Sequence, residues 1–278
     1  MMTITQAAKK EILRSYVDVA GLGLEIGPQA NGIVPKREGF NCRIADWASG
    51  QVLRNAYKTT PGIDETLIED VDYVTGGQPL CEVIEDRGTF DYIIASHVIE
   101  HIPDPVRFLN DCQKILKASG PLVLAIPDKR YIFDVLRPVS SLGDIMQAHI
   151  EKRVKHPAGK QLDLYALGAC RGGGYIWGPE HAGELIFLHS LKEAKTRFDK
   201  ARNTEGYIDT HGWCFTPASF RLLIRDLEEL EELSLKEVQF SCHGPEFFVS
   251  LSETGTGPKC CRIELARLMV EEIGSVKP

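Results

Sequence analysis

The segment Phe90–Asp128, FDYIIASHVIEHIPDPVRFLNDCQKILKASGPLVLAIPD, decides the fold. It opens with a strand over residues 90–95 and closes with a strand over 122–126 that is entirely apolar, as strands in the centre of a parallel sheet are. Between them, Asp104 is the expected N-cap of a helix and Pro105 its first residue. The segment therefore predicts a strand–helix–strand unit of an α/β protein.

Strands and helices alternate on both sides of this segment. The other predicted strands lie at residues 23–26, 41–45, 71–74, 235–241 and 246–251. The last two are joined only by His243-Gly244-Pro245, so they predict an antiparallel hairpin. We expect a doubly wound, Rossmann-like, seven-stranded sheet with this hairpin at its C-terminal end.

Residues 128–214 interrupt the alternation. They contain Gly172-Gly173-Gly174, several aromatic side chains and scattered histidines, and we expect them to form a mostly helical insert after the fifth strand. The chain is thereby divided into a main domain, formed by residues 1–127 and 215–278, and an inserted segment over residues 128–214.

Composition argues against several classes of protein. The 278 residues are 43% hydrophobic, enough to bury a full core, and they carry 32 Lys and Arg against 39 Asp and Glu, a net charge of −7. An acidic chain is a poor binder of nucleic acid, which is held largely through its phosphates. No apolar run approaches the roughly 20 residues of a membrane helix, and the N-terminal sequence lacks the features of a signal peptide. We therefore expect a cytoplasmic protein with no membrane span and no nucleic-acid partner.

Polar residues follow the first two predicted strands, at the edge of the sheet where doubly wound proteins bind ligands. A nicotinamide site would require G-x-G-x-x-G after the first strand, but Gln29 occupies the position of the second glycine. Asp46 ends the second strand, about 20 residues after Gly27, where a carboxylate can accept hydrogen bonds from both hydroxyls of a ribose. The pattern predicts a nucleotide-like cofactor and argues against a dehydrogenase.

The acidic-x-Gly sequence Glu25-Ile26-Gly27 and the segment 90–128 resemble class I S-adenosylmethionine-dependent methyltransferases. In that family an Asp in the fourth strand, a Glu-His element, a Pro-started helix and an apolar fifth strand recur. The runs IPDKRYIFD at 126–134 and HGWCFTPASFRLL at 211–223 resemble a bacterial, methyltransferase type 11-like subgroup associated with surface-glycan gene clusters. The resemblance implies S-adenosyl-L-methionine as the cofactor. The residues that it assigns to cofactor binding are Glu25, Gly27, Pro28, Asp46, Gly76, Ser96 and His97.

The resemblance also implies methyl transfer, which we expect to be O-methylation of a sugar or another small hydroxylated metabolite. A neutral hydroxyl is a poor nucleophile, so a base within hydrogen-bond reach is expected. His97, which directly follows the fourth strand, is the first catalytic candidate, and His101 and Asp128 are the others. The insert would supply an acceptor pocket or a lid. The expected acceptor-binding residues are Arg130, Tyr131, His211 and Trp213.

Two other functions fit the same residues. Gln29 and Asn31 stand where glycines are common in the family, which is also compatible with a non-catalytic binding protein that kept the fold. The acceptor atom can equally be a nitrogen, as in an N-methyltransferase of a natural product. Neither the identity of the acceptor nor the oligomeric state follows from the sequence.

The element HVIEH at residues 97–101 resembles the Glu-x-x-Glu-His metal motif of small-RNA 2′-O-methyltransferases and ubiquinone-pathway O-methyltransferases, with His97 in place of the first Glu. Histidine and glutamate are competent ligands for a first-row divalent metal. A fourth ligand is not evident in the sequence, and Asp128 or His211 would have to be brought in by the fold. We therefore expect a metal-independent enzyme in which His97 acts on the acceptor.

Overall fold

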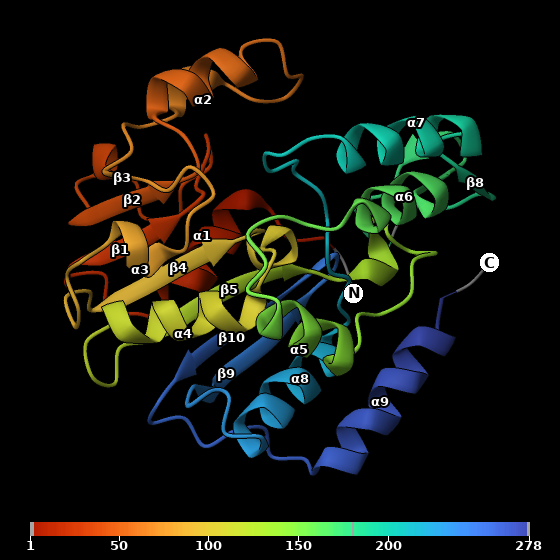
Figure 1. The fold of residues 1–278 in the computed structure, drawn as a ribbon. Helices are drawn as coiled ribbons and strands as arrows, with labels where there is room; N and C mark the ends of the chain where they lie inside the picture. The colour runs from red at the N-terminus through yellow and green to blue at the C-terminus, as the bar shows by residue number, and fades with distance from the viewer. Residues whose placement is uncertain (1–2, 180, 277–278) are drawn as a thin grey trace.

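The computed structural model describes residues 3–179 and 181–276. Its main sheet has seven strands in the order β3-β2-β1-β4-β5-β10-β9 (Figure 1). Strands β1 to β5 run parallel, whereas β10 is antiparallel to both β5 and β9. The strands are β1 (Gly23–Ile26), β2 (Cys42–Asp46), β3 (Tyr73–Val74), β4 (Tyr92–Ser96), β5 (Leu122–Pro127), β9 (Lys236–His243) and β10 (Glu246–Ser252). The predicted doubly wound sheet with a C-terminal hairpin is confirmed.

Helices cover both faces of this sheet (Figure 1). They are α1 (Gln6–Arg14), α2 (Gly50–Tyr57), α3 (Leu80–Val83), α4 (Pro105–Ile115), α5 (Leu142–Ile150), α6 (Ala158–Leu167), α7 (Leu191–Arg202), α8 (Pro217–Glu229) and α9 (Arg262–Gly274). Short 3-10 turns are η1 (Lys36–Glu38), η2 (Glu65–Leu67), η3 (Ile99–His101) and η4 (Lys129–Tyr131).

Alternating side chains of the central strands build the two halves of the core. On β4, Ile93 and Ala95 join a cluster that includes residues of α4 and α8, whereas Tyr92 and Ile94 pack with Leu13 of α1. Successive strand residues point to opposite faces of a sheet, so an apolar strand is covered on both sides. All six residues of β5 are buried, as its sequence predicts.

Helix α4 begins as predicted. The side chain of Asp104 accepts a hydrogen bond from the backbone N–H of Arg107 at 2.9 Å, and Pro105 is the first helical residue. Such a cap stabilises a helix by about 0.5–2 kcal/mol. The cap also fixes the end of the connection that leads from β4 into the helix.

The segment 128–214 contains α5, α6 and α7, as expected, together with a small antiparallel sheet that the sequence analysis did not predict. This sheet has the order β7-β6-β8 and consists of β6 (Ala169–Arg171), β7 (Gly174–Tyr175) and β8 (Leu185–Phe187). Gly172 and Gly173, with φ of 54° and 79°, form the turn between β6 and β7. Left-handed backbone of this kind favours glycine, so the glycine run is explained by a hairpin turn.

The two ends of the segment 128–214 lie side by side. Asp128 forms a parallel bridge with Phe215, and the backbone N–H of Lys129 donates to the carbonyl oxygen of Phe215 at 2.9 Å. The segment therefore begins and ends at one point, next to the carboxyl end of β5.

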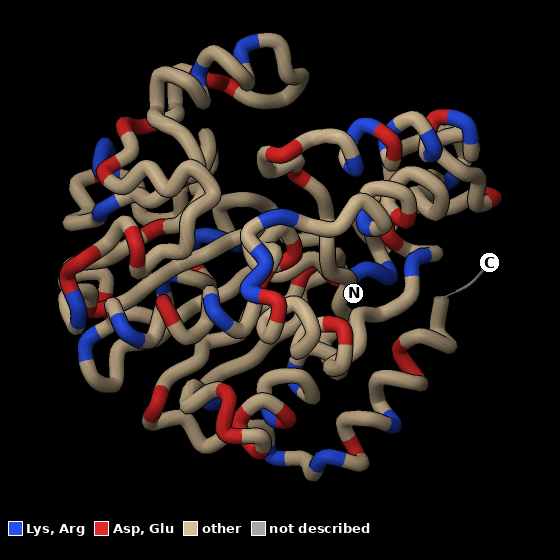
Figure 2. Tube along the Cα trace, viewed as in Figure 1, with Lys and Arg blue, Asp and Glu red and all other residues tan. Residues whose placement is uncertain are grey.

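Charged residues of both signs are interspersed along the described chain (Figure 2). Helix α7, for example, carries Lys and Arg as well as Asp and Glu. Among the described residues, no helix combines the length and the hydropathy needed to cross a membrane.

Candidate functional site

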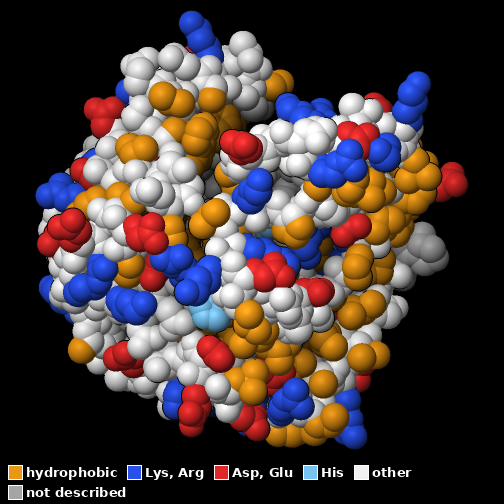
Figure 3. All heavy atoms as spheres, in the orientation of Figure 1, with side chains coloured by type: hydrophobic (Ala, Val, Ile, Leu, Met, Phe, Trp, Pro, Cys, Tyr) orange, Lys and Arg blue, Asp and Glu red, His pale blue; other side chains and the backbone are white. Residues whose placement is uncertain are grey.

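An open cavity of about 750 Å³ lies beyond the carboxyl ends of β1 to β4. The space-filling view shows the surface hollowed between the side that carries α2 and the side that carries α6 and α7 (Figure 3). The predicted site residues that line the cavity are Gly27, Asp46, Gly76, His97 and His101. The sheet edge that the sequence singled out thus carries a cavity of the size expected for a cofactor and a small acceptor.

Asp46 contributes a buried carboxylate to this cavity. Its side chain, at the end of β2, is 7% exposed, and Oδ1 accepts a hydrogen bond from the backbone N–H of Trp47 at 2.7 Å. Burial raises the pKa of Asp46 to about 6, and the hydrogen bond from Trp47 opposes the rise. Trp47 itself is 52% exposed and also lines the cavity. A buried carboxylate and a flat aromatic surface therefore lie next to each other in the cavity.

Glu25 holds the loop after β1 and lies outside the cavity lining, as does Pro28. Its two carboxylate oxygens accept hydrogen bonds from the backbone N–H groups of Ile33 at 2.5 Å and Val34 at 3.1 Å. The side chain is 2% exposed, and burial raises its pKa to about 7 against these hydrogen bonds. The acidic-x-Gly element thus shapes the loop, and the part of that loop that reaches the cavity includes Gly27 and Gln29.

The loops after β3 and β4 supply the remaining edge of the cavity. Gly76 and Gly77 follow β3 with φ of 59° and 87°, and both line the cavity. Ser96 is the last residue of β4 and is not part of the lining. His97 follows it with φ of 57°, a left-handed conformation that costs a residue other than glycine about 1–2 kcal/mol. Backbone strain of this kind persists where the surroundings over-determine it, often at functional sites.

His97 is held between two carboxylates. Its Nε2 lies 3.0 Å from Glu246, which also pairs with Lys9, and its Nδ1 lies 3.3 Å from Oε1 of Glu100. Burial works to lower the pKa of His97, but the two carboxylates outweigh it and the pKa is raised. The Trp177 ring, from the insert, lies 5.5 Å from the imidazole. His97 therefore has a fixed orientation at the cavity edge.

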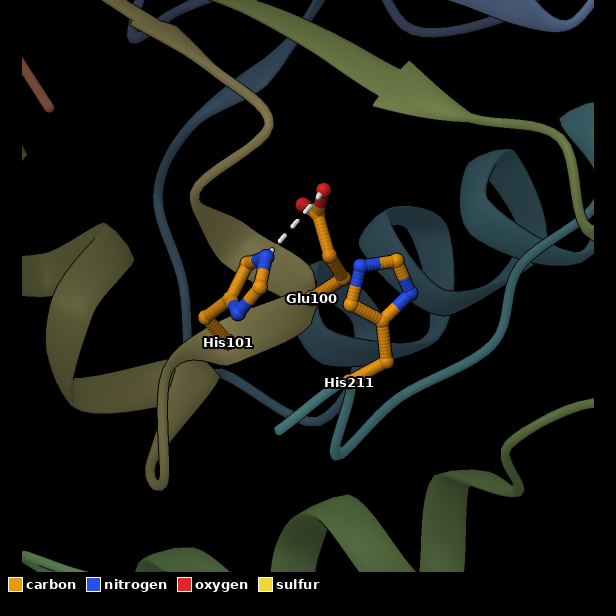
Figure 4. Close-up of side chains that lie close together, drawn as sticks. All are labelled: Glu100, His101 and His211. Carbon is orange, nitrogen blue, oxygen red and sulfur yellow. Dashed lines mark ion pairs between the residues drawn. The ribbon is translucent and has the colours of Figure 1, made fainter. Parts of the chain in front are cut away.

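Glu100, His101 and His211 converge (Figure 4), and Glu100 also lies beside His97. The 3-10 turn η3 places Glu100 and His101 on adjacent positions, and the two imidazole rings of His101 and His211 meet edge to face with centroids 4.6 Å apart. One ligand atom from each of the three residues lies within 4.8 Å of the others. His101 lines the cavity, while Glu100 is fully buried behind it.

Backbone contacts bring His211 to this position from the far end of the insert. The N–H groups of Gly212 and Trp213 both donate to the carbonyl oxygen of Glu100, at 2.8 and 3.2 Å. Gly212 has no room for a side chain, because a Cβ atom there would lie 2.0 Å from the His156 ring. Trp213 is 1% exposed and its Nε1 donates to the carbonyl oxygen of Ile102 at 2.6 Å. Trp213 therefore supports the site from within the core and does not line the cavity.

Asp128, Arg130 and Tyr131 form a separate group. The Arg130 guanidinium donates to both carboxylate oxygens of Asp128 and lies over the Tyr131 ring at 5.1 Å. Asp128 is 2% exposed, and burial raises its pKa although Arg130 opposes the rise. The three residues are not among those lining the cavity. The structure thus brings His97, His101 and His211 together but leaves this group beside β5.

Tyr207 and Asp209 are cavity residues that the sequence analysis missed. Asp209 accepts hydrogen bonds from the Tyr207 hydroxyl at 2.9 Å and from His101 Nδ1 at 2.8 Å. Burial works to raise the pKa of Asp209, but His101 and Tyr207 outweigh it and lower the pKa to about 2. The feature of the local sequence that could have pointed to Asp209 is its position two residues before His211.

Comparison with known proteins agrees with this architecture. A model of the methyltransferase domain family matches residues 15–204. A search of curated proteins finds no significant match. Among solved structures, the chain is similar to an S-adenosylmethionine-dependent methyltransferase from Methanosarcina mazei, at 12% identity and a TM-score of 0.43, over 88% of this chain and 97% of the other.

Two further solved structures are similar at the same low level of identity. One is described as a putative zinc-dependent alcohol dehydrogenase from Rhodobacter sphaeroides, at 12% identity and a TM-score of 0.46, over 90% of this chain and 91% of the other. The other is 1,6-didemethyltoxoflavin-N1-methyltransferase from Burkholderia thailandensis with bound S-adenosylhomocysteine. It is 8% identical with a TM-score of 0.41, over 88% of this chain and 76% of the other. All three TM-scores are below 0.5, whereas the family match spans more than half of the chain. The chain therefore belongs to the methyltransferase domain family and is an S-adenosylmethionine-dependent methyltransferase.

Proposed function

We propose that this methyltransferase methylates a hydroxyl group of a small acceptor, such as a sugar or another hydroxylated metabolite, in the cytoplasm. The observation that carries the proposal is the position of His97 and His101. Both imidazoles line the same cavity as Asp46, so a base and a cofactor-binding carboxylate face one space. A surface-glycan precursor is the acceptor class that the sequence resemblance favours.

The cavity residues fit S-adenosylmethionine. Asp46 offers a buried carboxylate to the ribose hydroxyls, and Gly27 and Gly76 present backbone without side chains at the cavity edge. When bound, the cofactor supplies a methyl group that is activated by the positive charge on sulfur. Glu25 would act on the cofactor only through the loop that it holds. Pro28 would act through the backbone next to Gly27, and Ser96 through the backbone next to His97.

The chemistry left to the protein is to orient the acceptor and remove its proton. With the cofactor held beside Asp46 and Gly27, the acceptor oxygen would be oriented toward the methyl group, and a neutral His97 would take the hydroxyl proton. Glu246 and Glu100 favour the imidazolium that results, because each carboxylate lies within 3.3 Å of a ring nitrogen. Transfer of the methyl group would leave S-adenosylhomocysteine, a methyl ether and a protonated His97.

A screen of acceptors tests the proposal. The protein is incubated with S-adenosylmethionine carrying a deuterated methyl group and with panels of sugars, nucleotide sugars and hydroxylated metabolites, and products are detected by mass. We expect a labelled methyl ether. Labelled amines would support an N-methyltransferase instead. Binding of S-adenosylhomocysteine without transfer to any acceptor would support a non-catalytic binding protein.

Asp46 gives a prediction for the cofactor. Asp46→Ala is expected to weaken S-adenosylhomocysteine binding by about 1–3 kcal/mol, because two charge-assisted hydrogen bonds are lost. The pKa of about 6 sets the pH dependence. The ionised carboxylate is the form that accepts both hydroxyls, so affinity rises as the pH increases through 6, and it falls at most about tenfold per pH unit below that value.

Calorimetry between pH 5 and pH 8 measures both effects. Asp86→Ala, which removes an exposed aspartate outside the cavity, is the matched control and should leave the affinity unchanged. Wild-type binding that does not change below pH 6, or an unchanged affinity of Asp46→Ala, would contradict the role of this carboxylate.

The hairpin of β6 and β7 gives a prediction for the acceptor. It leads to Trp177, which forms a bridge with Ile132 and contacts His97. Deleting residues 172–174 should displace Trp177 and lower acceptor turnover by about 10–10²-fold, because small misplacements are costly in catalysis. Affinity for S-adenosylhomocysteine, measured by calorimetry, should stay within about twofold. An equal loss of both quantities would show that the segment 128–214 supports the whole domain.

A further inference from the structure

We propose that Glu100, His101 and His211 bind a first-row divalent cation, such as Mn²⁺, Co²⁺ or Zn²⁺, at the acceptor end of the cavity. This revises the expectation of a metal-independent enzyme. The proposal for binding stands on the geometry of these side chains alone, and a catalytic use of the cation rests on the proposed methyl transfer.

The first observation is an unsatisfied carboxylate. Glu100 is fully buried, and neither of its side-chain oxygens accepts a hydrogen bond from the residues that the structure describes. The nearest cationic partners are His97 Nδ1 at 3.3 Å and His101 Nε2 at 3.9 Å. Burying a carboxylate without hydrogen bonds costs several kcal/mol unless it is paired or coordinates a metal. His97 already faces Oε1, and a cation between Glu100, His101 and His211 would supply the partner that Oε2 lacks.

The second observation is the convergence of ligand atoms. Figure 4 shows Glu100 and the two imidazoles directed toward a common space, with Nε2 of His101 facing the carboxylate. The three ligand atoms lie within 4.8 Å of one another. Metal–nitrogen and metal–oxygen bonds of about 2.0–2.2 Å would bring these atoms closer through modest side-chain rotations. Two imidazoles and one carboxylate suit a transition metal better than Mg²⁺, which prefers oxygen ligands.

The third observation is that each histidine is oriented by a carboxylate behind it. Nδ1 of His211 lies 2.6 Å from Asp134, which is itself held by Arg137 at 2.7 Å. Nδ1 of His101 lies 2.8 Å from Asp209. A carboxylate on one ring nitrogen fixes the tautomer and leaves the other nitrogen free to coordinate, the arrangement that surrounds metal-binding histidines in general.

The position of the group relates it to the acceptor. His101 lines the cavity whereas Glu100 lies behind it, so a cation held by both would have an open side toward the cavity. An acceptor hydroxyl bound at that side would be acidified by the positive charge. His97, on the same edge of the cavity, would be placed to receive the proton of the acceptor hydroxyl.

Cobalt binding tests the site independently of methyl transfer. Full-length protein is stripped with a chelator and titrated with Co²⁺, followed by calorimetry and by visible absorption, which reports nitrogen and oxygen ligation. We expect one equivalent to bind and to raise the melting temperature. Glu100→Gln and His211→Ala should each weaken binding by at least tenfold. Asp134→Asn, which removes the carboxylate that orients His211 and also pairs with Arg137, should weaken it by about 10–10²-fold in the folded variant.

His189→Gln is the matched control, because His189 lies in the insert outside the cavity lining. It should bind Co²⁺ like the wild type. S-adenosylhomocysteine affinity is measured on the metal-free protein in parallel. Intact cofactor binding without stoichiometric Co²⁺ binding by the wild type would overturn the metal site and leave the proposed function standing. Co²⁺ binding without cofactor binding would overturn the proposed function and leave the metal site standing. Unchanged Co²⁺ affinity in folded Glu100→Gln and His211→Ala would place the metal elsewhere and also overturn the assignment.

Discussion

His97→Asn is expected to lower the rate of methyl transfer by about 10²–10⁴-fold, the usual contribution of a positioned acid or base. Asparagine is chosen because it tolerates the left-handed backbone, with φ of 57°, that His97 adopts. The substitution removes the imidazole that lies between Glu100 and Glu246. Steady-state kinetics with the acceptor found by the mass screen measures the effect.

The same variant separates two roles of His97. If the imidazole acts on the acceptor, S-adenosylhomocysteine affinity stays within about twofold of the wild type. A parallel loss of cofactor affinity would instead show that His97 binds the cofactor, the other role that the sequence resemblance assigns to it. His189→Asn serves as the control for replacing a histidine outside the cavity.

Trp213→Ala is expected to destabilise the protein by about 3–5 kcal/mol, the usual cost of removing a large aromatic side chain from a core. Trp213 is 1% exposed, donates a hydrogen bond to Ile102 and lies beneath the Lys160 ammonium at 4.3 Å. Its removal leaves a cavity and an unpaired carbonyl oxygen. Urea unfolding followed by far-UV circular dichroism measures the free energy of unfolding.

Trp177→Ala is the matched control, because Trp177 is 37% exposed. Its free energy of unfolding should change by less than about 1 kcal/mol. Trp213→Phe keeps most of the ring and should cost much less than alanine. Equal destabilisation by Trp213→Ala and Trp177→Ala would mean that Trp213 does not anchor the end of the insert.

The main sheet could be predicted because its signals are local. Apolar runs such as 122–126 and the cap formed by Asp104 and Pro105 are visible in a few consecutive residues. The small sheet of the insert could not, because β6, β7 and β8 have only two or three residues each. Periodicity is not measurable over so short a stretch.

The candidate site was predictable in part for the same reason. Asp46 ends one strand and His97 directly follows another, and their places at the sheet edge follow from topology. The direction in which a carboxylate points does not follow from topology. Glu25, for example, turns to the backbone of Ile33 and Val34. Nor does sequence reveal that His211 reaches Glu100, because the supporting Trp213–Ile102 hydrogen bond joins residues 111 positions apart.

The adjacent ends of the segment 128–214 have a consequence for how this part of the enzyme can change. Because Lys129 and Phe215 are hydrogen bonded to each other, the length of the chain between them is not set by the distance between its two ends. Inserted segments with neighbouring ends are well tolerated by folded domains. The outer part of the segment can therefore be exchanged, by evolution or by grafting, provided that Ile145, Ala148 and Trp213 still fill the core.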